Sequence, residues 1–312
     1  MLLKHYKKHF FDSLKNIQDE QEIDSFFFIL TEYLHNLKRV DIALNPNFEI
    51  SDEEVEKWNT ILSELQQEKP IQYITGEAWF YGLRFEVNEN TLIPRPETEE
   101  LVEWIIESQK SKVQSQKLEI LDIGTGSGCI PISLKANLPQ ANVSAIDVSE
   151  QALEVAKRNA ELNKVEINFI EANILEVEDL SQLPSPIIHH LSSYNIIVSN
   201  PPYVRNLEKQ EIKKNVLDYE PHLALFVEDT DALLFYRKIA QLALKNLSSN
   251  GLLFFEINQY LGNETVDLLE NLGFKSIELK KDIYGNDRMI KCSVWVSSRK
   301  FPKVFSQSHT MI

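Results

Sequence analysis

A glycine-rich turn between an apolar strand and a helix constrains the fold of this chain more than any other feature of its sequence. Residues 118–123 are mostly apolar and read as a buried strand, and residues 129–137 have a helical pattern. Between them lie Gly124, Gly126 and Gly128, which let the backbone turn sharply and approach a ligand closely. This succession predicts the first unit of an open α/β sheet, whose ligands bind at the carboxyl ends of the strands.

The alternation of strands and helices continues along the rest of the patterned sequence. Further strands are predicted at 142–147, 166–170, 194–199, 251–257, 275–279 and 289–297, and further helices at 149–163, 232–247 and 263–272. The turn at 284–287 makes the last two strands antiparallel. Residues 194–199 are mostly apolar, which predicts a strand buried on both faces. The sequence therefore predicts a mainly parallel sheet with helices on both faces.

The chain before this sheet is helical. Ser51 and Glu54 form the pattern of a capping box, and apolar residues follow at helical spacing. Residues 78–87 then read as two short strands about Gly82, the prolines in 92–96 favour an extended segment, and 97–107 reads as a helix. The predicted organisation is a helical domain at 1–75, a β-hairpin linker at 76–96, an α/β domain at 97–300, and a disordered tail at 301–312.

Composition excludes several classes of function. The chain has 47 acidic and 32 basic residues, a net charge of −15, which disfavours stable binding of nucleic acid and suits a protein partner. No apolar run reaches the roughly 20 residues of a membrane span, and the basic start lacks the apolar core of a signal peptide. Cys129, Cys292 and the pair His189-His190 lack metal-site spacing, so no metal is expected. We expect a cytoplasmic monomer.

An acidic residue at the end of the second predicted strand extends the glycine-rich turn into a candidate nucleoside site. Asp147 lies roughly 20 residues beyond the turn, the interval at which an acid reaches ribose hydroxyls. NAD would require GxGxxG, whereas this turn reads GxGxG, a spacing that resembles enzymes using S-adenosylmethionine. A tight turn without a ligand is the weaker alternative. The candidate cofactor-binding residues here are Gly124, Thr125, Gly126, Ser127, Gly128 and Asp147.

The tetrapeptide Asn-Pro-Pro-Tyr follows the strand 194–199 and therefore lies at the same edge of the predicted sheet. Its members are Asn200, Pro201, Pro202 and Tyr203. The prolines fix the backbone and cannot donate, so the segment presents the Asn200 side-chain oxygen and backbone carbonyls as rigid acceptors. Such acceptors suit a planar NH2 group, and Tyr203 offers a ring on which that group can stack. The pattern predicts methyl transfer to an amide or exocyclic amine, with Asn200 as the catalytic residue.

At this point the chain resembles the HemK/PrmC family, the glutamine methyltransferases of peptide-chain release factors. The resemblance runs from about 69 to 297, with a weaker helical match before it. Asn-Pro-Pro-Tyr alone is shared with DNA adenine methyltransferases, whereas Ile-Pro-Arg-Pro-Glu-Thr-Glu is more particular to this family. The matching stretches are Pro-Ile-Gln-Tyr-Ile-Thr-Gly-Glu at 70–77, Phe-Tyr-Gly at 80–82, Ile-Pro-Arg-Pro-Glu-Thr-Glu at 93–99, and 122–128, 199–203, Tyr-Glu-Pro at 219–221 and 281–288.

The resemblance implies a Rossmann-like, seven-stranded S-adenosylmethionine-dependent methyltransferase sheet behind a small all-helical N-terminal domain that recognises the substrate. The substrate would be the glutamine in the Gly-Gly-Gln loop of release factors, and the cofactor product would be S-adenosylhomocysteine. It also implies that residues 124–128 hold the methionine end of the cofactor, that Asp147 holds the ribose, and that residues 200–203 hold the glutamine amide, with Asn200 close to both ligands.

The chain departs from the family at positions around the outer pocket. Asn173 and Ile174 stand where the family has an acidic residue, often followed by an aromatic one, and they are the candidate residues toward the adenine. Residues 227–232 lack the family's glycines, and Asn258 replaces another. Two alternatives stay open: a DNA adenine methyltransferase, which must bind a polyanion and flip a base, and a non-catalytic cofactor-binding scaffold, which would have no use for the intact Asn-Pro-Pro-Tyr.

Overall fold

The computed structural model describes residues 1–110, 118–183 and 193–294, and a mixed β-sheet lies at the centre of this part of the chain. Among these residues the sheet has seven strands in the order β10-β11-β9-β6-β3-β4-β5, and β11 is antiparallel to both of its neighbours. The bounds are β3 Glu119–Ile123, β4 Asn142–Asp147, β5 Asn168–Glu171, β6 Tyr194–Ser199, β9 Leu247–Glu256, β10 Lys275–Lys281 and β11 Asp287–Ser293. The predicted sheet and its antiparallel last pair are confirmed.

Strand residues alternate between two apolar cores, one on each face of the sheet. Ile120 packs into the core on one face and Leu121 into the core on the other, and both are fully buried. On β6, Ile196 and Ile197 divide in the same way. The prediction that this strand is buried on both faces is confirmed, because each face carries its own layer of helices.

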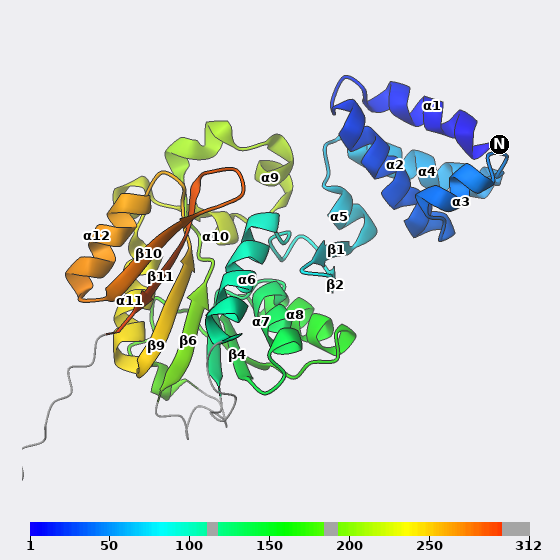
Figure 1. Cartoon of the computed structure of the whole chain (residues 1–312). Helices are drawn as coiled ribbons and strands as arrows, with labels where there is room; N and C mark the ends of the chain where they lie inside the picture. The colour runs from blue at the N-terminus through cyan, green and yellow to red at the C-terminus, as the bar shows by residue number, and fades with distance from the viewer. Residues whose placement is uncertain (111–117, 184–192, 295–312) are drawn as a thin grey trace, which may run out of the picture.

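The helices form these two layers (Figure 1). One face is covered by α6 Pro96–Lys110, α7 Cys129–Asn137 and α8 Glu150–Leu162, and the other by α11 Leu234–Asn246 and α12 Gly262–Leu272. Ser149 caps α8 as predicted, since its Oγ accepts from the backbone N–H of Ala152 at 3.1 Å.

The N-terminal helices surround a separate core. They are α1 Leu3–Leu14, α2 Glu20–His35, α3 Arg39–Leu44, α4 Asp52–Gln66 and α5 Ile71–Thr75. Trp58 is fully buried at the centre of this core and stacks on Phe27 with ring centroids 5.2 Å apart. The predicted capping box is confirmed by Glu54 N–H donating to Ser51 Oγ at 3.2 Å and Ser51 N–H donating to Glu54 at 2.7 Å.

A β-hairpin joins the helical part to the sheet (Figure 1). Its strands are β1 Glu77–Phe80 and β2 Leu83–Glu86, and both turn residues, Tyr81 and Gly82, have positive φ, as a tight hairpin turn requires. The buried Asn159 of α8 anchors it. Its side chain accepts from the Glu86 N–H at 2.6 Å and donates to the carbonyls of Glu86 and Ser127, each at 2.9 Å. The hairpin is thereby tied to the glycine-rich turn.

Some predicted boundaries were wrong. Pro96 was expected to extend the segment before α6, but it is the first residue of that helix, where a missing N–H costs nothing. β9 begins at Leu247, not at 251, because Leu247 pairs with Tyr194 across an irregularity in the ladder. Short elements after β6 were not predicted: β7 Val204–Arg205, α9 Lys214–Tyr219, α10 His222–Leu225 and β8 Phe226–Val227, together with 3-10 turns at Asn206–Glu211 and Asp229–Asp231.

The remaining boundaries differ by a few residues, as helix and strand ends commonly do. A further 3-10 turn lies at Leu180–Gln182. The expectations for the loop at His189-His190, for the connection at 111–117, for the end of the last strand and for the tail at 301–312 lie outside the described residues.

Candidate active site

The glycine-rich turn leaves the end of β3 in a backbone conformation that only glycine adopts freely. Gly124, Gly126 and Gly128 have φ of +77°, +54° and +81°. A side chain at Gly128 would also meet Ile132 at 3.0 Å and Ala156 at 3.1 Å. Gly128 therefore lets α7 approach α8, while the first two glycines shape the turn itself.

Asp147 lies at the end of the neighbouring strand β4 and holds this turn. One carboxylate oxygen accepts from the Gly126 N–H at 2.8 Å, and the other accepts from the Ser149 N–H at 2.9 Å. Burial raises the pKa of Asp147, and the N–H groups of Ser149 and Gly126 oppose that increase. The carboxylate keeps further lone pairs with which it can accept from a ligand hydroxyl.

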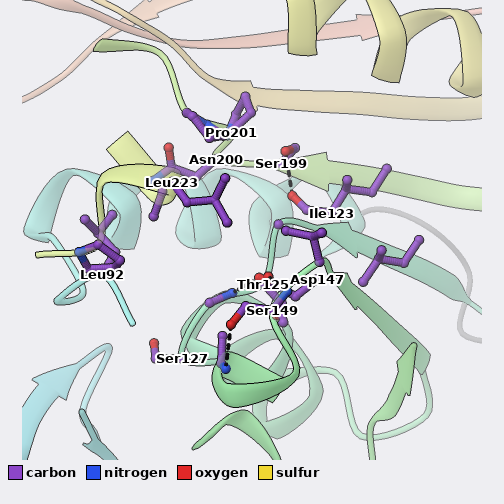
Figure 2. A pocket seen from close by; sticks show the side chains of 18 of the residues that line it. Leu92, Ile123, Thr125, Ser127, Asp147, Ser149, Ser199, Asn200, Pro201 and Leu223 are labelled. Atoms are coloured by element: carbon purple, nitrogen blue, oxygen red, sulfur yellow. Dashed lines mark hydrogen bonds between the residues drawn. The ribbon is translucent and has the colours of Figure 1, made fainter. Parts of the chain in front are cut away.

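A cavity of about 340 Å³ opens between this turn and the segment after β6. Figure 2 shows Asn200, Pro201 and Leu223 on one side of it and Thr125, Ser127 and Asp147 on the other. The predicted residues that line it are Gly124, Thr125, Gly126, Ser127, Asp147, Asn173, Ile174, Asn200, Pro201 and Pro202. The structure thus brings residues of both predicted sites, far apart in the sequence, to one cavity.

Two predicted residues lie away from this cavity. Gly128 packs between helices, as described above. Tyr203 packs against the core on the α11 side of the sheet, and its hydroxyl donates to the Glu256 carboxylate at 3.1 Å. Its role as a stacking platform stays a prediction.

The pairing of β3 with β6 places the two site segments beside each other. The strands are parallel, and Ile123 is the partner of Ser199. The Ser199 hydroxyl donates to the Ile123 carbonyl at 2.6 Å (Figure 2). The next residues along each strand, Gly124 and Asn200, therefore leave the sheet at the same edge, where a ligand can contact both.

Asp122 is a buried acid beneath the turn. It is fully buried, and among the described residues neither of its carboxyl oxygens makes a hydrogen bond of ordinary geometry, although the nearby Thr125 and Ile123 act to lower its pKa. Burial raises the pKa of Asp122 to about 7, and the charge of Asp147 adds to the increase. An unpaired carboxylate at such a position costs stability, and a cationic ligand would offset that cost. Asp122 lies beneath the cavity lining and Asp147 within it, so the two acids fit S-adenosylmethionine, which carries a sulfonium, an ammonium group and ribose hydroxyls.

Two segments of the cavity lining are held together by a buried acid. Glu220, whose side chain is 1 % exposed, accepts from the Ile93 N–H at 3.1 Å and from the Arg95 guanidinium at 2.5 Å. Ile93 and Arg95 line the cavity together with Pro221 and Leu223. Two stretches noted for the family resemblance, 93–99 and 219–221, thus meet at the cavity.

Sequence reasoning assigned no role to several residues around the site. Thr98 and Glu256 hydrogen-bond each other next to Asn200, and Asp122 and Glu220 are buried acids beside the cavity. Thr98 and Glu220 lay within quoted family stretches, and Asp122 immediately precedes the glycine-rich turn. Their places in these stretches were the only indication in the sequence that they belong to the site. Their contacts span more than a hundred residues of sequence, so the pairings themselves could not be read from it.

Neither a metal-binding cluster nor a membrane-spanning helix is found among the described residues. No group of three or more His, Cys, Asp or Glu side chains there is arranged to hold a metal ion. None of the helices in the described ranges combines the length and the apolar character that crossing a membrane requires.

Comparison with known families gives matches over most of the chain. The model of the PrmC N-terminal domain matches residues 8–76, and that of the methyltransferase small domain matches residues 105–222. A solved structure of the hMettl16 catalytic domain in complex with a 3′UTR hairpin covers 69 % of this chain and 77 % of its own, with a TM-score of 0.52 and 18 % identity. That likeness supports the fold alone.

Curated relatives are similar over nearly their whole length. The release factor glutamine methyltransferase of Flavobacterium psychrophilum is 62 % identical over 93 % of this chain and 99 % of its own. The protein of the same name from Bacteroides thetaiotaomicron is 40 % identical over 89 % and 95 %. That from Lactococcus lactis is 39 % identical over 82 % and 89 %.

Proposed function

Because this chain belongs to the family of release factor glutamine methyltransferases, we propose that it methylates the side-chain amide nitrogen of a glutamine in a peptide-chain release factor. The proposed target is the glutamine of the Gly-Gly-Gln loop, and the methyl donor is S-adenosylmethionine, as the methyltransferase fold implies. The observation that carries the proposal is the position of Asn200 opposite the glycine-rich turn in one cavity.

The cofactor would be held by the β3 and β4 ends of the sheet. Asp147 would accept from the ribose, and the buried charge of Asp122 would favour the cationic methionine end. Asn173 and Ile174 line the cavity beyond Asp147 and would contact the adenine. When bound, the cofactor supplies a methyl group on a sulfonium, which is electrophilic without any metal.

The segment after β6 would hold the glutamine. An amide nitrogen is a poor nucleophile because its lone pair is delocalised. The Asn200 carbonyl oxygen and nearby backbone carbonyls would accept from the two N–H bonds, which favours the positive charge that develops on nitrogen during an in-line displacement. Pro201 and Pro202 keep these acceptors rigid, so the nitrogen is oriented before the reaction. One N–H proton is released to solvent after the transfer.

A protein substrate fits the charge and architecture better than nucleic acid does. The net charge of −15 repels a polyanion. We propose that residues 1–75 form a substrate-recognition domain, that 76–96 link it to a methyltransferase domain at 97–300, and that the enzyme acts as a monomer. Because release factors belong to the translation machinery, we propose the cytoplasm as its location.

Mass spectrometry tests this function directly. A release factor incubated with the enzyme and S-adenosylmethionine should gain one methyl group, and fragmentation should assign it to the glutamine side chain of the Gly-Gly-Gln loop. A methyl group on another residue would refute the proposed target, and no gain with a folded, cofactor-binding enzyme would refute the proposed reaction.

A further inference from the structure

A chain of hydrogen bonds behind Asn200 fixes the direction of its amide group. The Asn200 NH2 lies 3.3 Å from Thr98 Oγ1, and Thr98, on α6, is 2 % exposed. The Thr98 hydroxyl in turn lies 2.6 Å from one carboxylate oxygen of Glu256, at the end of β9. The three side chains come from separate elements; Asn200 and Thr98 line the cavity, and Glu256 lies behind Thr98.

The chemistry of Glu256 decides which way each hydrogen bond runs. A carboxylate can only accept, so the Thr98 hydroxyl must give its one proton to Glu256. Thr98 Oγ1 is then left as an acceptor toward Asn200, and the group of Asn200 that faces it must be the NH2. The hydrogen bonds therefore run from the Asn200 amide to the Thr98 hydroxyl and from that hydroxyl to the Glu256 carboxylate.

Hydroxyl groups donate to both carboxyl oxygens of Glu256, the arrangement that a carboxylate accepts. Its second oxygen accepts from the Tyr203 hydroxyl at 3.1 Å, and the Arg288 guanidinium adds a nearby positive charge. These groups oppose burial, which raises the pKa of Glu256. Arg288 itself is held by Asp282, with its Nε 3.1 Å from the carboxylate.

The direction of the Asn200 amide matters for the substrate. With the NH2 directed to Thr98, the carbonyl oxygen faces the cavity, and no hydrogen bond from the described residues engages it. A reversed amide would present an NH2 group to the NH2 of the substrate, donor against donor. The oxygen and the NH2 of an Asn amide have nearly the same shape, so only their hydrogen-bond partners distinguish the two orientations.

We propose that Thr98 and Glu256 are positioning residues, which hold the Asn200 amide with its carbonyl oxygen toward the substrate nitrogen. This inference rests on the proposed function, in which Asn200 accepts from the amide to be methylated. Neither residue contacts the reacting atoms. Their effect is on turnover more than on binding, because a misdirected acceptor still leaves both ligand pockets in place.

The test uses the full-length enzyme with Thr98→Val and Thr98→Ser. Valine keeps the shape of threonine and removes the hydroxyl, whereas serine restores the hydroxyl without the methyl group. We expect Thr98→Val to lower single-turnover rates about ten- to a hundredfold, with KM for the release factor and Kd for S-adenosylmethionine changed less than about threefold. Thr98→Ser should recover most of the rate. Thr265→Val is the matched control, since Thr265 is equally buried but donates to Leu261 O on α12.

A second variant keeps the test decisive if Thr98→Val does not fold. Glu256→Gln offers an NH2 that can donate to Thr98, so the hydroxyl can turn toward Asn200 and reverse its amide. The same loss of rate with unchanged cofactor affinity is expected. Wild-type rates in folded Thr98→Val or Glu256→Gln, beside an inactive Asn200→Ala, would overturn the positioning role alone. Full activity of Asn200→Ala would instead overturn the role of Asn200 in the proposed function.

Discussion

Asp147 Oδ2 lies 2.8 Å from the backbone nitrogen of Gly126, which joins the end of β4 to the glycine-rich turn after β3. The same carboxylate holds the Ser149 N–H at the start of α8. One side chain thus fixes the turn and the residue that caps α8. In the proposed function it also accepts a hydrogen bond from the cofactor ribose. This sharing of one carboxylate explains why the two strand ends form a single pocket.

Replacement of Asp147 should weaken cofactor binding. Asp147→Ala removes a charge-assisted hydrogen bond to the ribose and should cost about 1.5–3 kcal/mol of binding free energy. Asp147→Asn keeps one acceptor oxygen and should lose less. Calorimetric titration with S-adenosylmethionine measures both, and unchanged affinity in folded Asp147→Ala would remove Asp147 from the cofactor site.

The raised pKa of Asp122 predicts a pH-dependent stability. The pKa of Asp122 is raised from 3.8 to about 7 in the folded chain, so between these values the folded state keeps a proton that the unfolded state releases. Unfolding is therefore favoured increasingly as pH rises from about 4 to about 7, by about 4 kcal/mol in total. Asp122→Asn has no carboxyl group at this position, so its unfolding free energy lacks this pH dependence.

Urea unfolding of the wild type and Asp122→Asn, without cofactor, checks this. The variant should gain stability relative to the wild type between pH 5 and pH 8. The same variant should bind S-adenosylmethionine more weakly at pH 8, because the charge that favours the cationic ligand is gone. A stability difference that does not change with pH would show that Asp122 titrates normally.

Substitutions of Asn200 should separate the contribution of its acceptor oxygen to turnover from that of its side-chain shape. Asn200→Ala deletes the acceptor used in the transition state and should lower turnover by orders of magnitude. Asn200→Asp retains acceptors but adds a negative charge and removes the NH2 that faces Thr98, so it should also be impaired. Single-turnover assays at saturating cofactor measure both, with thermal unfolding as the check on folding. Full activity in both variants would exclude the proposed role.

Removal of the N-terminal helices should affect the two ligands differently. Their core around Trp58 is separate from the cores on the sheet, and the cavity is lined by residues from Glu89 onward. A chain lacking residues 1–70 should therefore bind S-adenosylmethionine nearly as the full chain does and bind the release factor more weakly. Calorimetry with each ligand measures this. Equal release-factor affinity in the shortened chain would contradict a recognition role for residues 1–75.

Local patterns were sufficient to predict most of the fold. The capping residues Ser51 and Ser149 were identified because the first turn of a helix needs a nearby acceptor, a requirement that is met within three residues. The strand 194–199 was identified because burial on both faces favours a nearly continuous apolar run. Each of these patterns lies within a few neighbouring residues, and few other structures would produce it.

Contacts between distant segments could not be predicted in this way. The hydrogen bond from Thr98 to Glu256 joins residues 158 apart, and that from Ile93 to Glu220 joins residues 127 apart. The short elements between Val204 and Val227 are too brief for any periodicity, and they contact distant segments, as Glu220 does with Arg95 and Tyr219 with Gln67. Sequence reasoning found most of the glycine-rich turn, Asp147 and Asn200 in the cavity lining, but it missed lining residues such as Thr98 and the buried Glu220 that holds Arg95.

The most direct measurement of the central claim is the transfer of labelled methyl groups from S-adenosylmethionine to two candidates, side by side, at physiological salt. One is a folded release factor, with a copy whose Gly-Gly-Gln glutamine is changed as the control, and the other is duplex DNA. The account predicts label in the intact release factor and none in the altered copy or in DNA. Label in DNA adenine and none in the protein would contradict it.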